Sequence, residues 1–167
     1  VAKLILPEAA EILPIEQPGQ FLAFEWVPPV DVLRELSPGR GRRKLTRGVG
    51  NTSMDFAFLA RNRARQTVLV LGESKYTEHY PRRLVDPVLA SKRLARLESL
   101  LEPLPWLPVR SQGNRQLLAT EPVYQLLRHH IMALRLRESF QKIDDVHLVH
   151  LFVDRPLAYS GETSPIL

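Results

Sequence analysis

The chain has 167 residues, 44% of them hydrophobic, a length that suits one globular domain with a substantial core. It has no cysteine, which excludes disulfides and thiolate metal sites, and no apolar run approaches the roughly 20 residues needed to span a bilayer. The net charge of +5, carried mostly by arginine, favours a polyanionic partner, although arginine richness also arises from genome composition or a hot habitat.

No targeting segment is visible, so a cytoplasmic protein is the default expectation. The chain begins with Val1 rather than methionine, which is compatible with a domain cut from a longer protein. We expect a single domain over residues 1–155 and an irregular tail over residues 156–167. There is no internal repeat, no P-loop and no dinucleotide-binding glycine pattern.

The first part of the chain predicts a helix and then a strand. Pro7 and Glu8, within a mixed apolar and acidic run, predict the start of a short helix. Residues 20–30 are rich in aromatic and apolar side chains and predict a strand. Strict alternation would place Ala23 on one face and Trp26 on the other, with Trp26 in the core.

A glycine-rich basic segment follows, with no acidic residue between positions 38 and 50. Its glycines make the backbone permissive, and its unbalanced charge prevents it from folding on its own, so we expect a loop. Both a solvated loop and contact with phosphate groups are open interpretations. The basic residues of this segment are Arg40, Arg42, Arg43, Lys44 and Arg47.

Two strand-like runs come next, over residues 53–59 and residues 67–71, with a polar loop between them. If Arg61 and Thr67 close an antiparallel hairpin, its register places Asp55 directly opposite a residue that follows the second run, Glu73. Cross-strand neighbours on one face have Cβ atoms about 4.5–5.5 Å apart, so the hairpin predicts two carboxylates in one small patch.

The second run also ends in charge, which a buried strand does not do without a reason. Glu73 and Lys75 are two positions apart, so they share one side of the strand, while Ser74 points to the other. An acid therefore lies beside a base on the face that also carries Asp55.

The remaining elements are two helices and a last strand. Asp86 predicts an N-cap, with helical apolar spacing after it, and a second helix is expected from about Pro122 to Phe140. Residues 145–153 predict the final strand. Helix and strand spacing separate the histidines, so we interpret them as structural rather than as paired metal ligands; they are His129 and His130, and His147 and His150.

An aspartate followed on the next strand by Glu-x-Lys resembles the signature of the PD-(D/E)xK phosphodiesterases, the restriction-endonuclease-like nucleases. The resemblance covers residues 50–78 closely and the rest of the chain in its order of elements. It implies an α/β fold with an αβββαβ core, a mixed central sheet flanked by helices. Some of these nucleases carry an additional acid on the first helix, where Glu8 and Glu11 stand as candidates beside a solvated helix face.

The resemblance implies a magnesium-dependent endonuclease of the restriction or repair type that cleaves DNA. Asp55 and Glu73 would bind Mg²⁺ or Mn²⁺, and Lys75 would act on the attacking water and on transition-state charge. Gln125 and Arg128 resemble accessory groups that such nucleases place on a helix flanking the sheet, although helix packing or solvent exposure is the simpler interpretation of Gln125.

Three alternatives stay open from the sequence. Glu73 and Lys75 could form a strand-end ion pair, although such pairs contribute only about 0–1 kcal/mol. The fold could bind nucleic acid without cutting it, or it could serve as an interaction domain with its basic residues scattered over the surface. A homodimer and additional domains of a longer chain are equally compatible with the sequence.

Overall fold

The computed structural model of the protein describes residues 2–35, 51–75, 86–101 and 117–152. In these ranges no helix is long and apolar enough to cross a membrane. The helices are α1 (Ala2–Ile5), α2 (Pro87–Leu101) and α4 (Val123–Ser139), and the strands are β1 (Ala9–Leu13), β2 (Ala23–Trp26), β3 (Met54–Asn62), β4 (Thr67–Lys75) and β5 (Asp145–Phe152).

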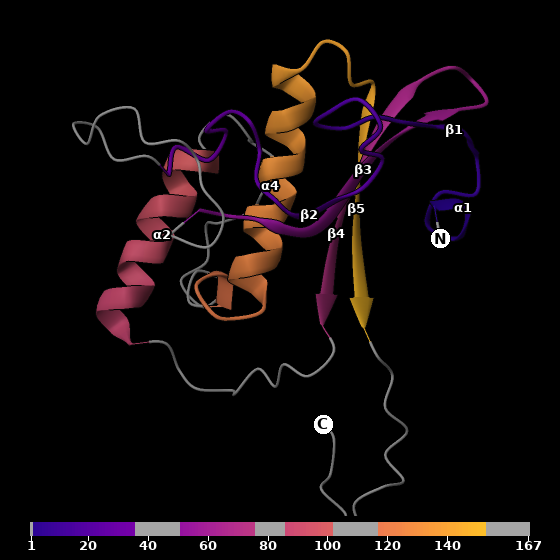
Figure 1. Ribbon diagram of the computed structural model, residues 1–167. Helices are drawn as coiled ribbons and strands as arrows, with labels where there is room; N and C mark the ends of the chain where they lie inside the picture. Colours follow the sequence, from indigo (N-terminus) through magenta and orange to yellow (C-terminus); the bar gives the residue numbers. More distant parts are fainter. Residues whose placement is uncertain (1, 36–50, 76–85, 102–116, 153–167) are drawn as a thin grey trace, which may run out of the picture.

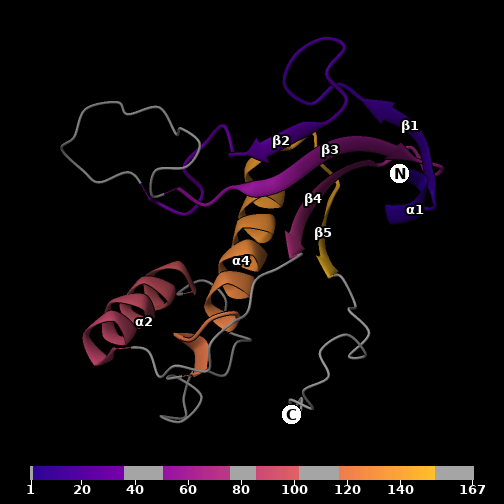
Figure 2. The ribbon, with the colours of Figure 1, turned by 60° about the horizontal axis from the view of Figure 1, so that its bottom comes forward.

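The five strands form one mixed sheet in the order β1-β3-β4-β5, with β2 also paired to β3. Strand β3 is long enough for β1 to pair with one half and β2 with the other, so these two strands lie along the same edge of β3 (Figure 2). The pairing of β4 with β5 is parallel, and every other pairing is antiparallel. The predicted α/β class with a mixed sheet is confirmed.

Strand β4 is buried on both faces and separates two apolar clusters. Leu69 and Leu71 belong to the larger cluster, under helices α2 and α4, while Val68 and Val70 belong to a smaller cluster on the opposite face. The smaller cluster is covered by Leu6, which follows α1. Figure 1 shows α2 and α4 on one side of the sheet. Within the described ranges, the sheet therefore has a helix side and a second side with a smaller apolar cluster.

The predicted hairpin register is confirmed. Backbone pairs between β3 and β4 run from Arg61 with Thr67 to Phe56 with Gly72. The connection is tight, since the Asn62 backbone N–H donates to the carbonyl oxygen of Gln66 at 2.9 Å. Both strands extend further than the apolar runs alone indicated, because the cross-strand hydrogen bonds continue past the last apolar residue.

The prediction of a helix starting at Pro7 is wrong. The helix ends at Ile5, Pro7 lies in a turn, and the following residues form strand β1. Ala9 is buried at 5% exposure in the smaller cluster, and Glu11 forms an ion pair with Arg61 of β3 at 2.7 Å. Pairing with the free edge of β3 therefore overrides the helical pattern, and it places Glu11 at the far end of β3 from Asp55.

The predicted alternation along β2 also fails at one residue. Glu25 has a φ of 45°, in the left-handed region, which breaks the extended geometry of the strand. As a result Ala23 and Trp26, three positions apart, are both buried in the helix-side core. The expectation that Trp26 is a core residue is confirmed at 4% exposure.

Helix α2 begins as predicted, because the Asp86 carboxylate accepts hydrogen bonds from the backbone N–H groups of Val88 and Leu89 at 2.9 and 3.1 Å. Arg93 then ties α2 to the start of α4. One guanidinium nitrogen donates to the carbonyl oxygen of Ala119 at 2.8 Å, and another pairs with Glu121 at 2.9 Å. The Arg93 guanidinium also lies 4.6 Å from the centroid of a ring on α4, that of Tyr124.

Candidate active site

Strand β4 carries a buried carboxylate near its end. Glu73 is only 4% exposed, and by alternation it lies on the same side of the sheet as Leu69 and Leu71, under the helices. The Gln125 side chain on α4 donates a hydrogen bond from Nε2 to Oε1 of Glu73 at 2.9 Å. A buried carboxylate needs partners of this kind, because removing an ionised group from water is costly.

Asp55 of β3 lies at the same end of the hairpin. The last backbone pair on this side joins Phe56 to Gly72, and the same register continued by one residue places Asp55 opposite Glu73. The Asp55 side chain is exposed, and its Oδ2 accepts a hydrogen bond from the backbone N–H of Ser74 at 2.7 Å. The structure thus brings the two predicted carboxylates onto neighbouring strands, one exposed and one buried.

A pair of histidine rings lies next to Glu73. His150 of β5 pairs with Glu73 in the parallel ladder, and its ring stacks on His129 of α4 with centroids 5.8 Å apart and an interplanar angle of 20°. His129 is 2% exposed and follows Gln125 by four residues, so both lie on one face of α4. The stacked rings therefore help to pack α4 against the sheet beside the candidate site. The adjacent His130 is exposed, as helix spacing predicted.

Gly72, the residue before Glu73 on β4, is covered by an aromatic ring. A Cβ atom at this position would lie 1.9–2.3 Å from ring atoms of Phe56, the residue opposite it. Only glycine leaves room for the ring at this pair. The ring therefore packs on the strand backbone immediately before Glu73, on the face opposite to the helices.

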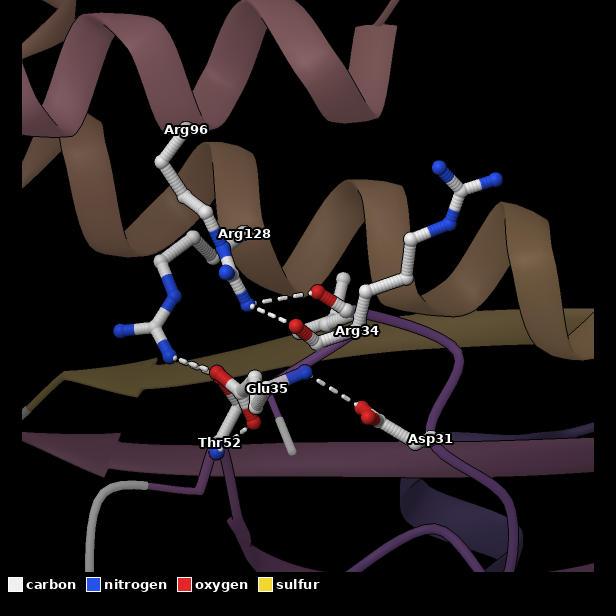
Figure 3. Close-up of polar contacts among 7 residues, drawn as sticks. Asp31, Arg34, Glu35, Thr52, Arg96 and Arg128 are labelled. Carbon is white, nitrogen blue, oxygen red and sulfur yellow. Dashed lines mark hydrogen bonds and ion pairs between the residues drawn. The ribbon is translucent and has the colours of Figure 1, made fainter. Parts of the chain in front are cut away.

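Arg128, predicted as an accessory group, contacts a different part of the site. Its guanidinium Nη2 pairs with Oε1 of Glu35 and donates to Oγ1 of Thr52. Thr52 in turn donates from its backbone N and its hydroxyl to the two oxygens of Glu35, each at 2.6 Å. We call these three residues the Glu35 cluster (Figure 3). Its member on α4, Arg128, lies about one helical turn after Gln125.

The residues before Glu35 are also held in place. The Glu35 backbone N–H donates to the Asp31 carboxylate at 2.6 Å, and Arg96 of α2 donates to the carbonyl oxygens of Leu33 and Arg34 at 2.7 and 2.8 Å. Figure 3 shows Arg96 and Arg128 approaching this short segment from the two helices. Arg96 is half-buried, and its two hydrogen bonds hold this segment against α2.

Two parts of the predicted site lie outside the described atoms. Lys75 is the last residue of β4 and its backbone pairs with Phe152, but the prediction for its side chain falls outside the described part of the chain. The same holds for the proposed phosphate contacts of the basic segment, because residues 36–50 are not described.

A protein-family model described as "Restriction Endonuclease associating with ARP" matches residues 2–157. The chain belongs to this restriction endonuclease family. The match runs from α1 through β5, and it confirms the resemblance to restriction-endonuclease-like nucleases that the Asp and Glu-x-Lys pattern predicted. No curated protein and no solved structure gives a match.

The carboxylates of this restriction endonuclease family member fit a magnesium ion by their chemistry. Among the described residues, no group of three or more histidine, cysteine, aspartate or glutamate side chains is arranged to hold a metal. Mg²⁺ does not require such a cage, because it keeps several waters and is usually held by one or two carboxylates together with substrate phosphates. Asp55 and Glu73 supply that smaller set of oxygens.

Sequence reasoning on this member of the family missed the Glu35 cluster. In the described ranges, the buried polar or charged residues are Thr52, Glu73 and His129, and each lies within reach of α4. Glu35 and Thr52 flank the basic segment in the sequence, but nothing in their spacing indicates that they bond to each other. Their two direct hydrogen bonds form only in the folded chain, and Arg128 of α4 joins both residues from a third part of the sequence.

Proposed function

We propose that this protein is a magnesium-dependent endonuclease that cleaves DNA phosphodiester bonds. The proposal rests on one observation, the β3–β4 register, which brings the exposed Asp55 opposite the buried Glu73 at one end of the sheet. Membership in a restriction endonuclease family supports nuclease chemistry at this point. The runner-up is a nuclease-like fold that binds nucleic acid without cutting it.

In this proposal Asp55 and Glu73 hold the divalent ion, Mg²⁺ or Mn²⁺, through their carboxylate oxygens. When bound, the ion supplies charge neutralisation at the phosphate and a more acidic water. Gln125 orients the Glu73 carboxylate through the 2.9 Å hydrogen bond, and the Ser74 backbone N–H does the same for Asp55 at 2.7 Å. Both of these donors are uncharged, so they orient the carboxylates without neutralising them.

Lys75 is proposed to act on the reacting atoms. A lysine ammonium can orient the attacking water by a hydrogen bond and stabilise the negative charge that develops on the phosphate. Its place in β4, two residues after Glu73, supports this role.

The basic segment is proposed to contact phosphate groups of the DNA. Support comes from its two ends, because Glu35 and Thr52 bond to each other and Thr52 precedes Asp55 by three residues. The segment therefore leaves and rejoins the described chain close to the candidate site. The residues proposed to bind phosphate are Arg40, Arg42, Arg43, Lys44 and Arg47.

The deciding experiment incubates the wild-type protein with double-stranded and single-stranded DNA in the presence of Mg²⁺, Mn²⁺ or a chelator. We expect cleavage with either ion and none with the chelator, since both ions accept oxygen ligands. DNA binding without metal-dependent cleavage of either substrate would contradict the proposal and favour the binding module.

A further inference from the structure

Glu35 has a largely buried side chain and lies outside the proposed metal site. Its side chain is 8% exposed, and both oxygens accept hydrogen bonds from Thr52, at 2.6 Å each. Arg128 supplies the compensating positive charge. A partly buried ion pair of this kind is weak as a source of net stability, because the cost of desolvating the two groups offsets much of their attraction. Its position invites a functional explanation.

The two partners of Glu35 lead to the two sides of the proposed metal site. Thr52 lies three residues before Asp55 at the start of β3. Arg128 lies three residues after Gln125 on α4, and Gln125 donates to Glu73. The Glu35 carboxylate therefore links two segments. One is the segment that precedes Asp55, and the other is helix α4, whose Gln125 bonds to Glu73.

Asp55 lies one residue beyond the last backbone pair of β3 with β4, and next to a distortion in β2. On the β4 side the backbone pairs end at Phe56. On the other side they reach Met54, opposite Trp26, but β2 is distorted just before that point by the left-handed Glu25. The Thr52–Glu35 contact supplies the next fixed point along the chain. The direction in which β3 enters the sheet, and with it the placement of Asp55, then depends on this contact.

We propose that Glu35 is a positioning residue for the metal ligand Asp55, acting through Thr52 and held against α4 by Arg128. The inference rests on the proposed function of Asp55 and Glu73. Glu35 itself is not a ligand in this scheme, because both of its oxygens are engaged by Thr52 and one of them also by Arg128.

The test measures Mn²⁺ binding by calorimetry on the full chain in the absence of DNA. Glu35→Gln keeps the shape but removes the charge that faces Arg128, and Thr52→Val removes the hydroxyl but keeps the branched shape. We expect each to weaken Mn²⁺ binding by about tenfold or more, as losses of groups that orient a metal ligand do. Thr52→Ser keeps the hydroxyl and should restore wild-type affinity. Cleavage by Glu35→Gln and Thr52→Val should recover as Mn²⁺ approaches saturation.

Glu11→Gln is the matched control, because Glu11 also pairs with an arginine, Arg61, but is exposed and lies at the far end of β3 from Asp55. Its Mn²⁺ affinity should equal that of the wild type. Wild-type affinity in both Glu35→Gln and Thr52→Val would overturn the inference, and so would complete loss of binding in Glu35→Gln, which would make Glu35 a ligand. If Glu35→Gln fails to fold, the comparison of Thr52→Val with Thr52→Ser decides. A wild-type protein that binds no Mn²⁺ would instead refute the proposed function.

Discussion

Glu73 occupies a position where an apolar side chain would serve the core better. The residues before it on the same face of β4, Leu69 and Leu71, are 2% and 0% exposed, and Glu73 at 4% continues that row with a carboxylate. An ion pair at a strand end does not account for this burial, because exposed pairs lie in water, where they contribute about 0–1 kcal/mol. The proposed role as a metal ligand would explain why a carboxylate is kept under α4, next to Gln125.

Substitutions of the three predicted catalytic residues should affect Mn²⁺ binding and DNA cleavage differently. Asp55→Ala and Glu73→Ala should abolish both Mn²⁺ binding and DNA cleavage, because each removes ligand oxygens. Lys75→Ala should bind Mn²⁺ as the wild type does but turn over about 100-fold more slowly, since its charge acts on the water and the transition state. Calorimetry and single-turnover cleavage separate the two effects. A Lys75→Ala variant that cuts at the wild-type rate would make the Glu-x-Lys pattern a coincidence.

At the scale of elements, the β3–β4 hairpin decides the geometry of the site. Its register is local: once the loop after Asn62 closes, every pair up to Phe56 with Gly72 follows. This is why the neighbourhood of Asp55 and Glu73 could be predicted from the sequence. Gly72 is the one glycine in the hairpin, and the Phe56 ring fills the space that it leaves.

Gly72→Ala should destabilise the protein by about 1–3 kcal/mol, because a methyl group would overlap the Phe56 ring and force it to move. Urea unfolding measures the change in free energy. In the background of Phe56→Ala the same substitution should cost much less, with a coupling energy of about 0.5–3 kcal/mol in the double-mutant cycle. Strictly additive effects would show that the ring does not constrain position 72.

The parts of the fold that depend on long-range packing could not be predicted in the same way. Residues 9–13 have a pattern that suits a helix, but the open edge of β3 recruits them as a strand. The helix spacing placed Gln125 and Arg128 on a face of α4 without indicating that one would meet Glu73 and the other Glu35. The Gln125–Glu73 contact spans 52 positions of the sequence, and the Arg128–Glu35 contact spans 93. No local sequence rule predicts contacts over such separations.

At the scale of the whole molecule, the net charge of +5 does not show which basic groups could bind a polyanion, because several arginines bond within the fold. Arg61 and Arg135 form exposed ion pairs with Glu11 and Glu138, and Arg96 donates to backbone carbonyls inside the fold. The segment between positions 38 and 50 holds five basic residues and no acidic residue, so it is the part of the chain for which we propose DNA contact.

Neutralising the basic segment should therefore lower the salt dependence of DNA binding. Replacing its five basic residues by glutamine should reduce the slope of log K against log salt by nearly one unit for each phosphate group that the protein no longer neutralises, because fewer counterions are released. Fluorescence anisotropy at several salt concentrations gives the slope. Replacement of the exposed Arg63 and Arg65, in the hairpin loop at the opposite end of β3 from Asp55, is the control and should leave the slope unchanged. An unchanged slope in the segment variant would indicate a solvated loop.

The contacts of Arg93 bear on which substitutions the chain can accumulate over evolutionary time. Its flat guanidinium reaches Ala119 and Glu121 with two different nitrogens while it lies over the Tyr124 ring. A lysine ammonium is a single compact point of charge and cannot meet both acceptors and the ring face in one geometry. Exchange of arginine for lysine, often regarded as neutral drift, would therefore be selected against here. Part of the arginine content of this chain is therefore explained by contacts within the fold, without any contact with nucleic acid.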